Sequence, residues 1–317
     1  MRPLAKVCLP FLVISLVLAH SLISYAAPEV KVEDVINGNL DSIAKPDVRS
    51  KGQSRVVEGS AQFKILTGGA GTQDGKAVIV SEGRKVQLNL KFPNSNYRGE
   101  KFITDGNKVM IGTSTDTQSR SSFGQLVYLE DAMMREGLLG GTLSTAWPLL
   151  DWNERKAKLT YEGLKTIDGR SLHDVRYKPK KNTDVEVHLF FDPETFRHVL
   201  SVYTMSIQAR MVQGGGQAGS LAIPELGSGT RDGSPIGLQG SVSGDAAQAS
   251  GQAQTRYRIE EHFSDFRTAD GFTLPTHYVI HYTQEPQGGK TTVLDWDVTT
   301  TRILQNVTLD PKNFEVR

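Results

Sequence analysis

The side chains best suited to hold a metal ion are histidines in the C-terminal half of the chain. His277 and His281 are four residues apart, a spacing that would place both imidazoles on one face of a helix. The alternating pattern around them predicts a strand, in which four residues span about 13 Å, too far for two ligands of one ion. His188 and His198 flank a turn at Asp192 and would not lie opposite each other in a tight hairpin. We therefore predict no metal site and treat the histidines as surface or rim side chains.

Pairs of carboxylates could perform general acid–base catalysis. Glu260 and Glu261 are neighbours in a predicted strand, so their side chains point to opposite faces and cannot share a substrate. Asp295 and Asp297 share a face, which the threonines and arginine nearby mark as the solvated one. The chain has no Gly-x-Ser-x-Gly or His-Glu-x-x-His motif, and the glycine-rich residues 68–71 lack the Lys and Ser/Thr of a phosphate loop. We predict that the protein is not an enzyme and uses no cofactor.

The N-terminal 26 residues have the three-part plan of a secretory signal peptide. Basic residues precede an apolar run over residues 7–23, and small residues follow at the expected cleavage site, after Ala26 or Ala27. Pro10 and His20 interrupt the run, which makes it short of the roughly 20 apolar residues that span a membrane. We predict cleavage of residues 1–26 and a soluble periplasmic protein, with a membrane anchor as the alternative.

Cysteine content and charge narrow the function further. The chain's only cysteine, Cys8, lies inside the predicted leader and lacks the small residues that precede a lipidated cysteine. The mature chain would then contain no disulfide and no thiolate nucleophile. A formal net charge of +1 provides no strong field to attract nucleic acid. We expect a monomer that binds no nucleic acid.

The elements that would position these side chains are mostly strands. In residues 85–92 apolar and polar side chains alternate, which is typical of a strand with one buried and one solvated face. The same pattern recurs over residues 57–65, 185–191, 199–207, 257–263, 278–282 and 292–298. Turn signals lie at residues 81–83, 105–107, 168–169, 192–195 and 270–271. The sequence predicts a mainly β protein of roughly ten to twelve antiparallel strands.

Two segments have helical spacing instead. Apolar residues at positions 32, 35, 36, 40 and 43 predict an amphipathic helix over residues 29–45, ended by Pro46. Residues 123–139 predict a second helix, capped by Ser121 or Ser122 and ended by Gly140 and Gly141, with a short further helix after it. This second group is either a core helix that covers the sheet or a lid over a cavity, for which methionines suit adaptable contacts.

Residues 213–254 differ from the rest of the chain in composition. They are rich in Gly, Ser, Gln and Ala and contain few large apolar side chains, so they cannot bury enough surface to offset chain entropy. We predict a flexible loop within a single domain over residues 27–317. The loop is either a spacer or a contact surface.

Several motifs resemble those of one group of families. Residues 265–275 read Asp-Phe-Arg-Thr-Ala-Asp-Gly-Phe-Thr-Leu-Pro and resemble the D-[YF]-R-x-x-D-G-x-x-L-P segment of the outer-membrane lipoprotein-sorting families (LolA-like and LolB-like). Residues 189–195, which follow the Asp168-Gly169 turn, resemble their F-D-P-x-T hairpin, and residues 307–314 resemble their usual ending. The order of elements, from the N-terminal helix to the helical interruption, is also similar.

The resemblance implies a fold and a function. The fold would be an incomplete, strongly curved antiparallel β-barrel with a helical plug or lid. The function would be that of a periplasmic binding or carrier protein for an acylated ligand, a lipid or a lipoprotein. An envelope interaction or sensor module of the same fold, with a transient protein partner, is the alternative. An arginine tethers the lid in some carriers; Arg55 and Arg84 are candidates here, and neither aligns with a family motif.

A carrier of this kind needs a dry apolar hollow, because each buried methylene contributes about 0.8 kcal/mol. The apolar strand faces and the helical interruption would supply its lining. The ligand-binding residues predicted on this basis are Phe63, Leu88, Leu90, Phe102, Leu126, Met133, Met134, Leu138 and Trp147.

Overall fold

The computed structural model describes residues 30–67, 71–93, 97–113, 120–208 and 254–316. The predicted signal peptide, residues 1–26, lies outside these ranges. Of the predicted loop over residues 213–254, only Gln254 is described, and it begins a strand, so the loop prediction extends one residue too far.

Within these ranges, twelve antiparallel strands form one sheet, in agreement with the predicted class and strand number. They are β1 (Ser54–Ile65), β2 (Gly71–Glu82), β3 (Lys85–Lys91), β4 (Glu100–Thr104), β5 (Val109–Thr113), β6 (Lys158–Ile167), β7 (Arg170–Lys178), β8 (Glu186–Phe191), β9 (His198–Gln208), β10 (Gln254–Ala269), β11 (Phe272–Pro286) and β12 (Thr292–Gln305). Their order is β5-β4-β3-β2-β1-β12-β11-β10-β9-β8-β7-β6. Sequence neighbours therefore pair throughout, except that β1 pairs with β12 and that β5 and β6 form the two edges.

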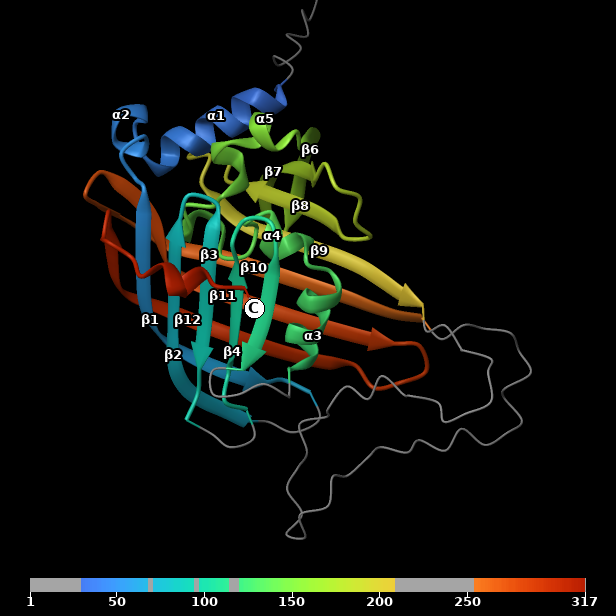
Figure 1. Cartoon of the computed structure of the whole chain (residues 1–317). Helices are drawn as coiled ribbons and strands as arrows, with labels where there is room; N and C mark the ends of the chain where they lie inside the picture. The colour runs from blue at the N-terminus through green and yellow to red at the C-terminus, as the bar shows by residue number, and fades with distance from the viewer. Residues whose placement is uncertain (1–29, 68–70, 94–96, 114–119, 209–253, 317) are drawn as a thin grey trace, which may run out of the picture.

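The sheet is not closed, and it curls strongly. In the strand order β4 and β11 are five positions apart, which in a flat sheet would be about 24 Å. Yet the ring of Phe123 lies 5.3 Å from that of Phe102 on β4 and 6.0 Å from that of Tyr282 on β11. Both strands can reach one ring only if the sheet bends around it, and Figure 1 shows this bend with α3 and α4 inside it.

The segment that follows β5 and precedes β6 must cross from one edge of the curled sheet to the other. Its described part, residues 120–157, is called here the covering segment. It contains α3 (Ser122–Leu129), α4 (Ala132–Arg135), the 3-10 turns η1 (Gly141–Leu143) and η2 (Pro148–Leu150), and α5 (Trp152–Arg155). The ring of Phe123 on α3 packs against rings on β4, β11 and β12, so the segment covers the concave face.

The prediction of a single helix over residues 123–139 is wrong. Ser121 caps α3 as expected, with its hydroxyl accepting from the backbone N–H of Gly124 at 3.0 Å. The helix ends at Leu129; its C-cap, Glu130, has φ of −115° and ψ of 70°, and α4 begins two residues after this cap. A continuous helix of this length would be about 25 Å long. Two short helices instead keep both halves of the segment against the curled sheet, so packing overrides the local pattern.

The helix predicted over residues 29–45 is confirmed as α1 (Val32–Ile43). Its buried face contains Val35, Ile36 and Ile43, and it packs against β6, β11 and η2 at one end of the sheet (Figure 1). Pro46 does not only stop this helix but starts a second short one, α2 (Pro46–Arg49), because the first position of a helix needs no backbone N–H. The last element is η3 (Pro311–Phe314).

Candidate functional site: the covered concave face

The concave face is lined by the apolar side chains that the sequence assigned to a ligand cavity. All nine have between 0% and 2% of their surface exposed and belong to one continuous core. They are Phe63 on β1, Leu88 and Leu90 on β3, Phe102 on β4, Leu126 on α3, Met133 and Met134 on α4, and Leu138 and Trp147 elsewhere in the covering segment. The structure brings them together beneath and within that segment, and their role as ligand contacts stays a prediction.

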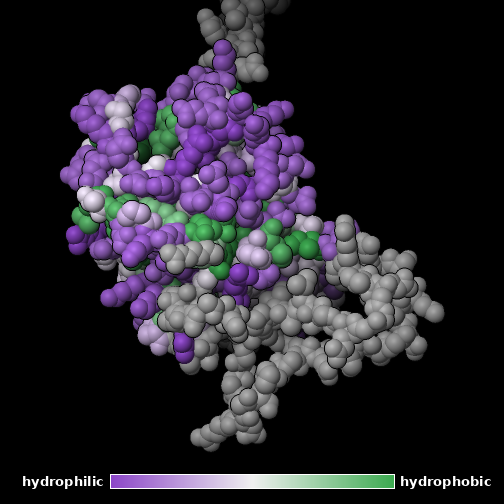
Figure 2. Space-filling view, in the orientation of Figure 1, coloured by the Kyte–Doolittle hydropathy of each residue, from purple (hydrophilic) through white to green (hydrophobic). Residues whose placement is uncertain are grey.

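The side chains of the covering segment occupy the hollow of the sheet. Figure 2 shows a mostly hydrophilic outer surface with apolar side chains in a band across its middle. The large apolar side chains that are well exposed in the described ranges are few: Leu66, Tyr128, Leu129, Leu150 and Leu164. The apolar face is therefore closed in this structure, and an acyl chain could reach it only by displacing part of the cover.

A buried carboxylate lies within this apolar face. Glu261 on β10 has 0% of its surface exposed and accepts three hydrogen bonds. The donors are the backbone N–H of Gly140 at 2.8 Å, the hydroxyl of Tyr203 at 2.6 Å and the hydroxyl of Tyr278 at 2.5 Å. Burial raises the pKa of this carboxyl to about 7, because the loss of water outweighs the three donors.

A sequence signal for Glu261 exists in the strand that carries it. Ile259 and Phe263, two residues before and after it, are buried on the same face of β10. A carboxylate on the buried, apolar face of an alternating strand destabilises the fold by several kcal/mol unless hydrogen-bond donors surround it. Its presence there therefore indicates a polar contact inside the core. The expectation that Glu260 and Glu261 face opposite sides is confirmed, since Glu260 lies outside with Arg258.

Two glycines let the covering segment come this close to the sheet. Residues 137–147, called here the central turn, include Gly140 with φ of 84° and Gly141 with φ of 50°, a region that side chains disfavour. A Cβ at Gly141 would lie 2.7 Å from the ring of Phe263 and 3.1 Å from Nδ1 of His198. Glycine is therefore needed for the backbone to reach Glu261.

Arg55 on β1 holds the same turn through a carbonyl. The residue is 4% exposed, and its guanidinium donates to the carbonyl of Thr142 at 2.6 Å and to Oε1 of Gln305 at 3.1 Å. Burial lowers the pKa of Arg55 to about 10, so it stays protonated at neutral pH. Of the two arginines considered from the sequence, Arg55 contacts the central turn from inside, whereas Arg84 is 44% exposed and pairs with Asp151 near α5.

Three further polar contacts hold the end of the central turn. The indole N–H of Trp147 donates to Oδ1 of Asn39 on α1 at 3.1 Å, so the turn is tied to the first helix. The backbone N–H of Thr145 donates to the hydroxyl of Ser81 on β2 at 2.9 Å. The hydroxyl of Thr145 donates to the carbonyl of Gly83 at 3.2 Å. The central turn is thus attached to the sheet mainly through its backbone.

A second buried carboxylate holds the start of the covering segment. Glu100 on β4 is 1% exposed and accepts from the backbone N–H of Ser121 at 2.8 Å, from the Ser121 hydroxyl at 2.6 Å and from the Tyr97 hydroxyl at 3.3 Å. Burial raises the pKa of Glu100 as well. The first turn of α3 is therefore fixed to the sheet beside the edge strand.

The expectation that the histidines lie at the surface or rim is wrong for His198. It is 0% exposed, its ring centroid lies 4.4 Å from that of Trp147, and its Nε2 lies 3.0 Å from the Ser201 hydroxyl. A serine beside a histidine is the arrangement used for nucleophilic catalysis. Burial lowers the pKa of His198 to about 3, however, which makes it a weak base. We interpret the pair as part of the packed core.

The other histidines discussed above pair with carboxylates on the outer face. His277 lies 2.8 Å from Asp297, and His281 lies 2.6 Å from Asp295. The two histidines that are four residues apart thus have separate partners on β12, as the strand spacing requires. Within the described ranges, no group of three or more His, Cys, Asp or Glu is placed to hold a metal ion.

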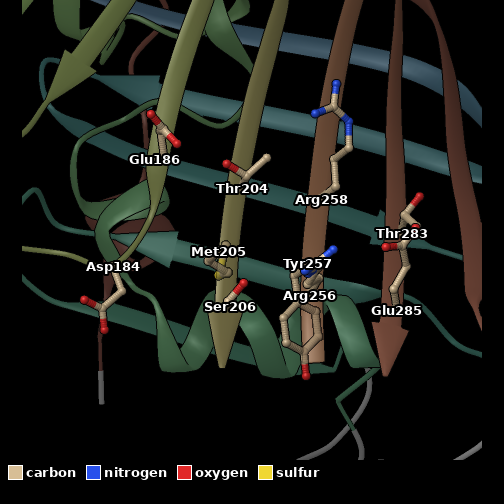
Figure 3. Close-up of a pocket in the computed structure, with 10 residues that line it drawn as sticks. All are labelled: Asp184, Glu186, Thr204, Met205, Ser206, Arg256, Tyr257, Arg258, Thr283 and Glu285. Atoms are coloured by element: carbon tan, nitrogen blue, oxygen red, sulfur yellow. The ribbon is translucent and has the colours of Figure 1, made fainter. Parts of the chain in front are cut away.

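A hollow in the described part of the chain lies beside the concave core, because Met205 of that core and Tyr257, which packs against it, both line it. It has a volume of about 360 Å³ and lies across β8 to β11, where Arg256 and Arg258 alternate with Tyr257 (Figure 3). Glu186 and Glu285 also line it, and Arg258 is paired with Glu260. None of the nine predicted ligand-binding residues lines this hollow. In the described part of the chain, no helix is long and apolar enough to cross a membrane.

These features define a class of protein: a single curled antiparallel sheet with a helical segment strapped over its concave face. No protein-family model and no curated protein sequence matches the chain. The solved structures similar to it include LolA superfamily and lipoprotein-sorting proteins, the group that the sequence motifs resemble.

Three of these structures cover nearly the whole chain. A LolA superfamily protein from Nitrosomonas europaea has 12% identity over 90% of this chain and 98% of its own, with a TM-score of 0.42. A putative outer membrane lipoprotein-sorting protein domain from Vibrio parahaemolyticus has 7% identity over 90% and 97%, with a TM-score of 0.42. A DUF1329 family protein from Desulfovibrio piger has 12% identity over 90% and 97%, with a TM-score of 0.43.

Proposed function

We propose that this protein is a periplasmic, non-catalytic carrier that binds the acyl chain of a lipid or lipoprotein on its concave face. The ligand replaces the central turn, which swings away from the sheet. The observation that carries the proposal is the pairing of a continuous apolar face with a cover attached through backbone hydrogen bonds to Glu261, Arg55 and Ser81. Such bonds can be exchanged for water without leaving a gap in the strands themselves.

The energies favour displacement of only part of the cover. A 16-carbon acyl chain has about 14 methylenes, and at about 0.8 kcal/mol each its burial contributes about 11 kcal/mol. Exposing one large apolar side chain costs about 1.5–3 kcal/mol, so one acyl chain compensates for roughly four to seven of them. The central turn includes four buried ones, Leu138, Leu139, Leu143 and Trp147. One chain can therefore replace this turn, whereas α3 and α4 stay in place.

A disulfide across the closed cover tests the proposal. Ser81→Cys with Thr145→Cys, in a Cys8→Ser background, joins the central turn to β2 where the Ser81 hydroxyl and the Thr145 N–H are 2.9 Å apart. Thr268→Cys with Thr273→Cys is the matched control, because these hydroxyls are 2.8 Å apart in an exposed hairpin away from the cover. We measure binding of dansyl-undecanoic acid to each protein before and after reduction.

The oxidised Ser81–Thr145 variant should bind the probe at least tenfold more weakly than its reduced form, and the hairpin control should be insensitive to reduction. Equal binding of the probe by the oxidised and reduced Ser81–Thr145 variant would show that any acyl site lies elsewhere. In parallel, native mass spectrometry of protein exported by a Gram-negative host should find an acylated ligand, and repeated absence of one counts against the carrier role.

The closed packing favours one alternative, an envelope interaction or sensor module with the same fold. All nine predicted ligand-binding residues are already buried at 0–2% exposure, which a module without an acyl ligand would also require. Deletion of residues 213–253 separates the two roles. Loss of a protein partner with no change in probe binding supports a contact role for the deleted residues, and a protein that never binds the probe supports the alternative.

A further inference from the structure

The hydrogen-bond donors to Glu261 come from both the sheet and the covering segment. Two of its three donors, Tyr203 and Tyr278, belong to the sheet, and the third, Gly140, belongs to the central turn. An apolar residue at position 261 would suit the packed face at lower cost, because a buried carboxylate loses its hydration. A carboxylate here destabilises the fold, and this is explained if its charge state controls how firmly the covering segment is held.

In the described part of the molecule no cation hydrogen-bonds to Glu261; the neighbouring His262 lowers the pKa of Glu261, but less than burial raises it. From β9 it faces Tyr203, with His198 farther along behind the ring of Phe263. From β11 it faces Tyr278, whose ring stacks on Phe263 at 5.1 Å. The central turn has no titratable side chain, and Arg55 is engaged with Thr142 and Gln305. On β10 itself, His262 pairs with Glu260 on the other side of the sheet.

The neutral carboxyl fits this enclosure better than the ionised one. A protonated Glu261 can keep accepting from the Gly140 N–H on one oxygen, while its other oxygen carries the proton and donates it in a hydrogen bond to the Tyr203 hydroxyl oxygen. An ionised Glu261 keeps all three donors but holds its charge away from water with no directly paired cation. Opening the central turn removes one donor and admits water, which benefits the ionised form far more than the neutral form.

We propose that Glu261 is a proton-operated catch, which keeps the central turn closed when protonated and lets it open when ionised. This inference rests on the proposed carrier function for its purpose, since the catch would set the pH at which an acyl ligand is exchanged. Mildly acid conditions favour the closed state and neutral to alkaline conditions favour the open state.

The size of the effect follows from linkage between the proton and the cover. The closed state holds the proton with a pKa of about 7, and a solvated glutamic acid has a pKa near 4.5. The closed state thus binds the proton more tightly, so acid closes the turn. The ratio of open to closed molecules rises up to tenfold per pH unit between about 4.5 and 7 and levels off above, a limit of about 300-fold in total.

Amide hydrogen exchange tests this without any ligand. We follow the peptides that contain residues 137–147 between pH 5 and pH 8, correct for the intrinsic pH dependence of exchange, and use peptides from β1 as an internal reference. The protection of the central turn should fall at least tenfold over this range, and the reference should not follow it. Glu261→Gln should abolish the fall.

Glu100→Gln is the matched control, because Glu100 is also a buried carboxylate with a raised pKa but holds α3 instead of the central turn. It should leave the pH dependence of residues 137–147 intact. Should Glu261→Gln fail to fold, Tyr278→Phe provides a second test: loss of one donor raises the pKa of Glu261, and the midpoint of the fall moves to higher pH. A flat profile in the wild type, or an unchanged fall in Glu261→Gln, overturns the catch.

Dansyl-undecanoic acid binding, measured on the same proteins, separates this inference from the carrier function. A pH-dependent central turn in a protein that never binds the probe supports the catch and refutes the carrier role. Probe binding with a flat exchange profile does the reverse.

Discussion

Replacing Arg55 by methionine should open the central turn while leaving the rest of the protein nearly as stable. Methionine has a similar length but cannot donate, so the carbonyl of Thr142 loses its partner at 2.6 Å. A hydrogen bond to a charged group contributes about 1.5–3 kcal/mol. The open form of the turn should therefore become about 10- to 150-fold more populated.

Global stability should respond differently because a buried charge is removed at the same time. Burial lowers the pKa of Arg55 to about 10, a drop that corresponds to about 3 kcal/mol of desolvation cost that methionine does not incur. That gain roughly offsets the lost hydrogen bonds to Thr142 and Gln305. We expect the urea midpoint of unfolding to stay close to that of the wild type.

The assay compares three quantities in the same protein: amide exchange of residues 137–147, the urea midpoint and the affinity for dansyl-undecanoic acid. Probe affinity should rise, because a site that is open more often binds with a smaller conformational cost. Arg84→Met is the control, since Arg84 is 44% exposed and its ion pair with Asp151 is worth no more than about 1 kcal/mol. The reasoning is refuted if Arg55→Met leaves protection of the central turn within twofold of the wild type, or if protection and global stability collapse together.

Two further predictions concern stability alone. Phe123→Ala removes the ring around which β4, β11 and β12 converge and should lower the free energy of unfolding by about 3–5 kcal/mol. Tyr128→Ala is the control, because Tyr128 is 49% exposed on the same helix, and it should change the free energy of unfolding by less than about 0.5 kcal/mol. Equal effects of the two substitutions in urea titration would contradict the central position of Phe123. The hydrogen bond from His262 and the nearby Arg258 lower the pKa of Glu260 to about 2, so its contribution to stability is present above pH 4.5 and is lost as the pH falls towards 2. Urea midpoints should therefore fall less steeply over this range in Glu260→Gln than in the wild type, and parallel curves would count against the assignment.

The sheet could be predicted from the sequence because its information is local. Alternation in residues 85–92 or 257–263 fixes which side chains face inward, and that pattern needs no knowledge of distant residues. The nine apolar residues predicted to contact a ligand are all buried, and their contact with a ligand stays a prediction. The break between α3 and α4 could not be predicted, because the limit on helix length is set by the curl of a sheet formed from strands far away in the chain.

The polar contacts of the site could not be predicted from the sequence for a related reason. Glu261 binds the backbone of Gly140, and Arg55 binds the backbone of Thr142; each hydrogen bond joins residues that are 87 or more positions apart. Their partners are backbone atoms, which every residue has, so no residue type on the partner side signals the contact. His198 was misplaced because a histidine beside a turn is usually solvated, and here the covering segment folds back over that turn.

The way the cover is attached determines which part of it can move. Its start is fixed by Glu100, which holds Ser121 beside the edge strand, and its end continues directly into β6. Between these anchors, positive φ values occur at Gly137, Gly140 and Gly141, which places the conformational freedom of glycine within the central turn. Both buried side chains hold this turn: Arg55 donates to the carbonyl of Thr142, and Glu261 accepts from the backbone N–H of Gly140. A segment that is fixed at both ends and has glycines in its middle can bend outward without detaching. If the protein is the acyl carrier proposed above, we therefore expect Arg55 and Glu261, and not the large apolar surface around them, to govern ligand exchange.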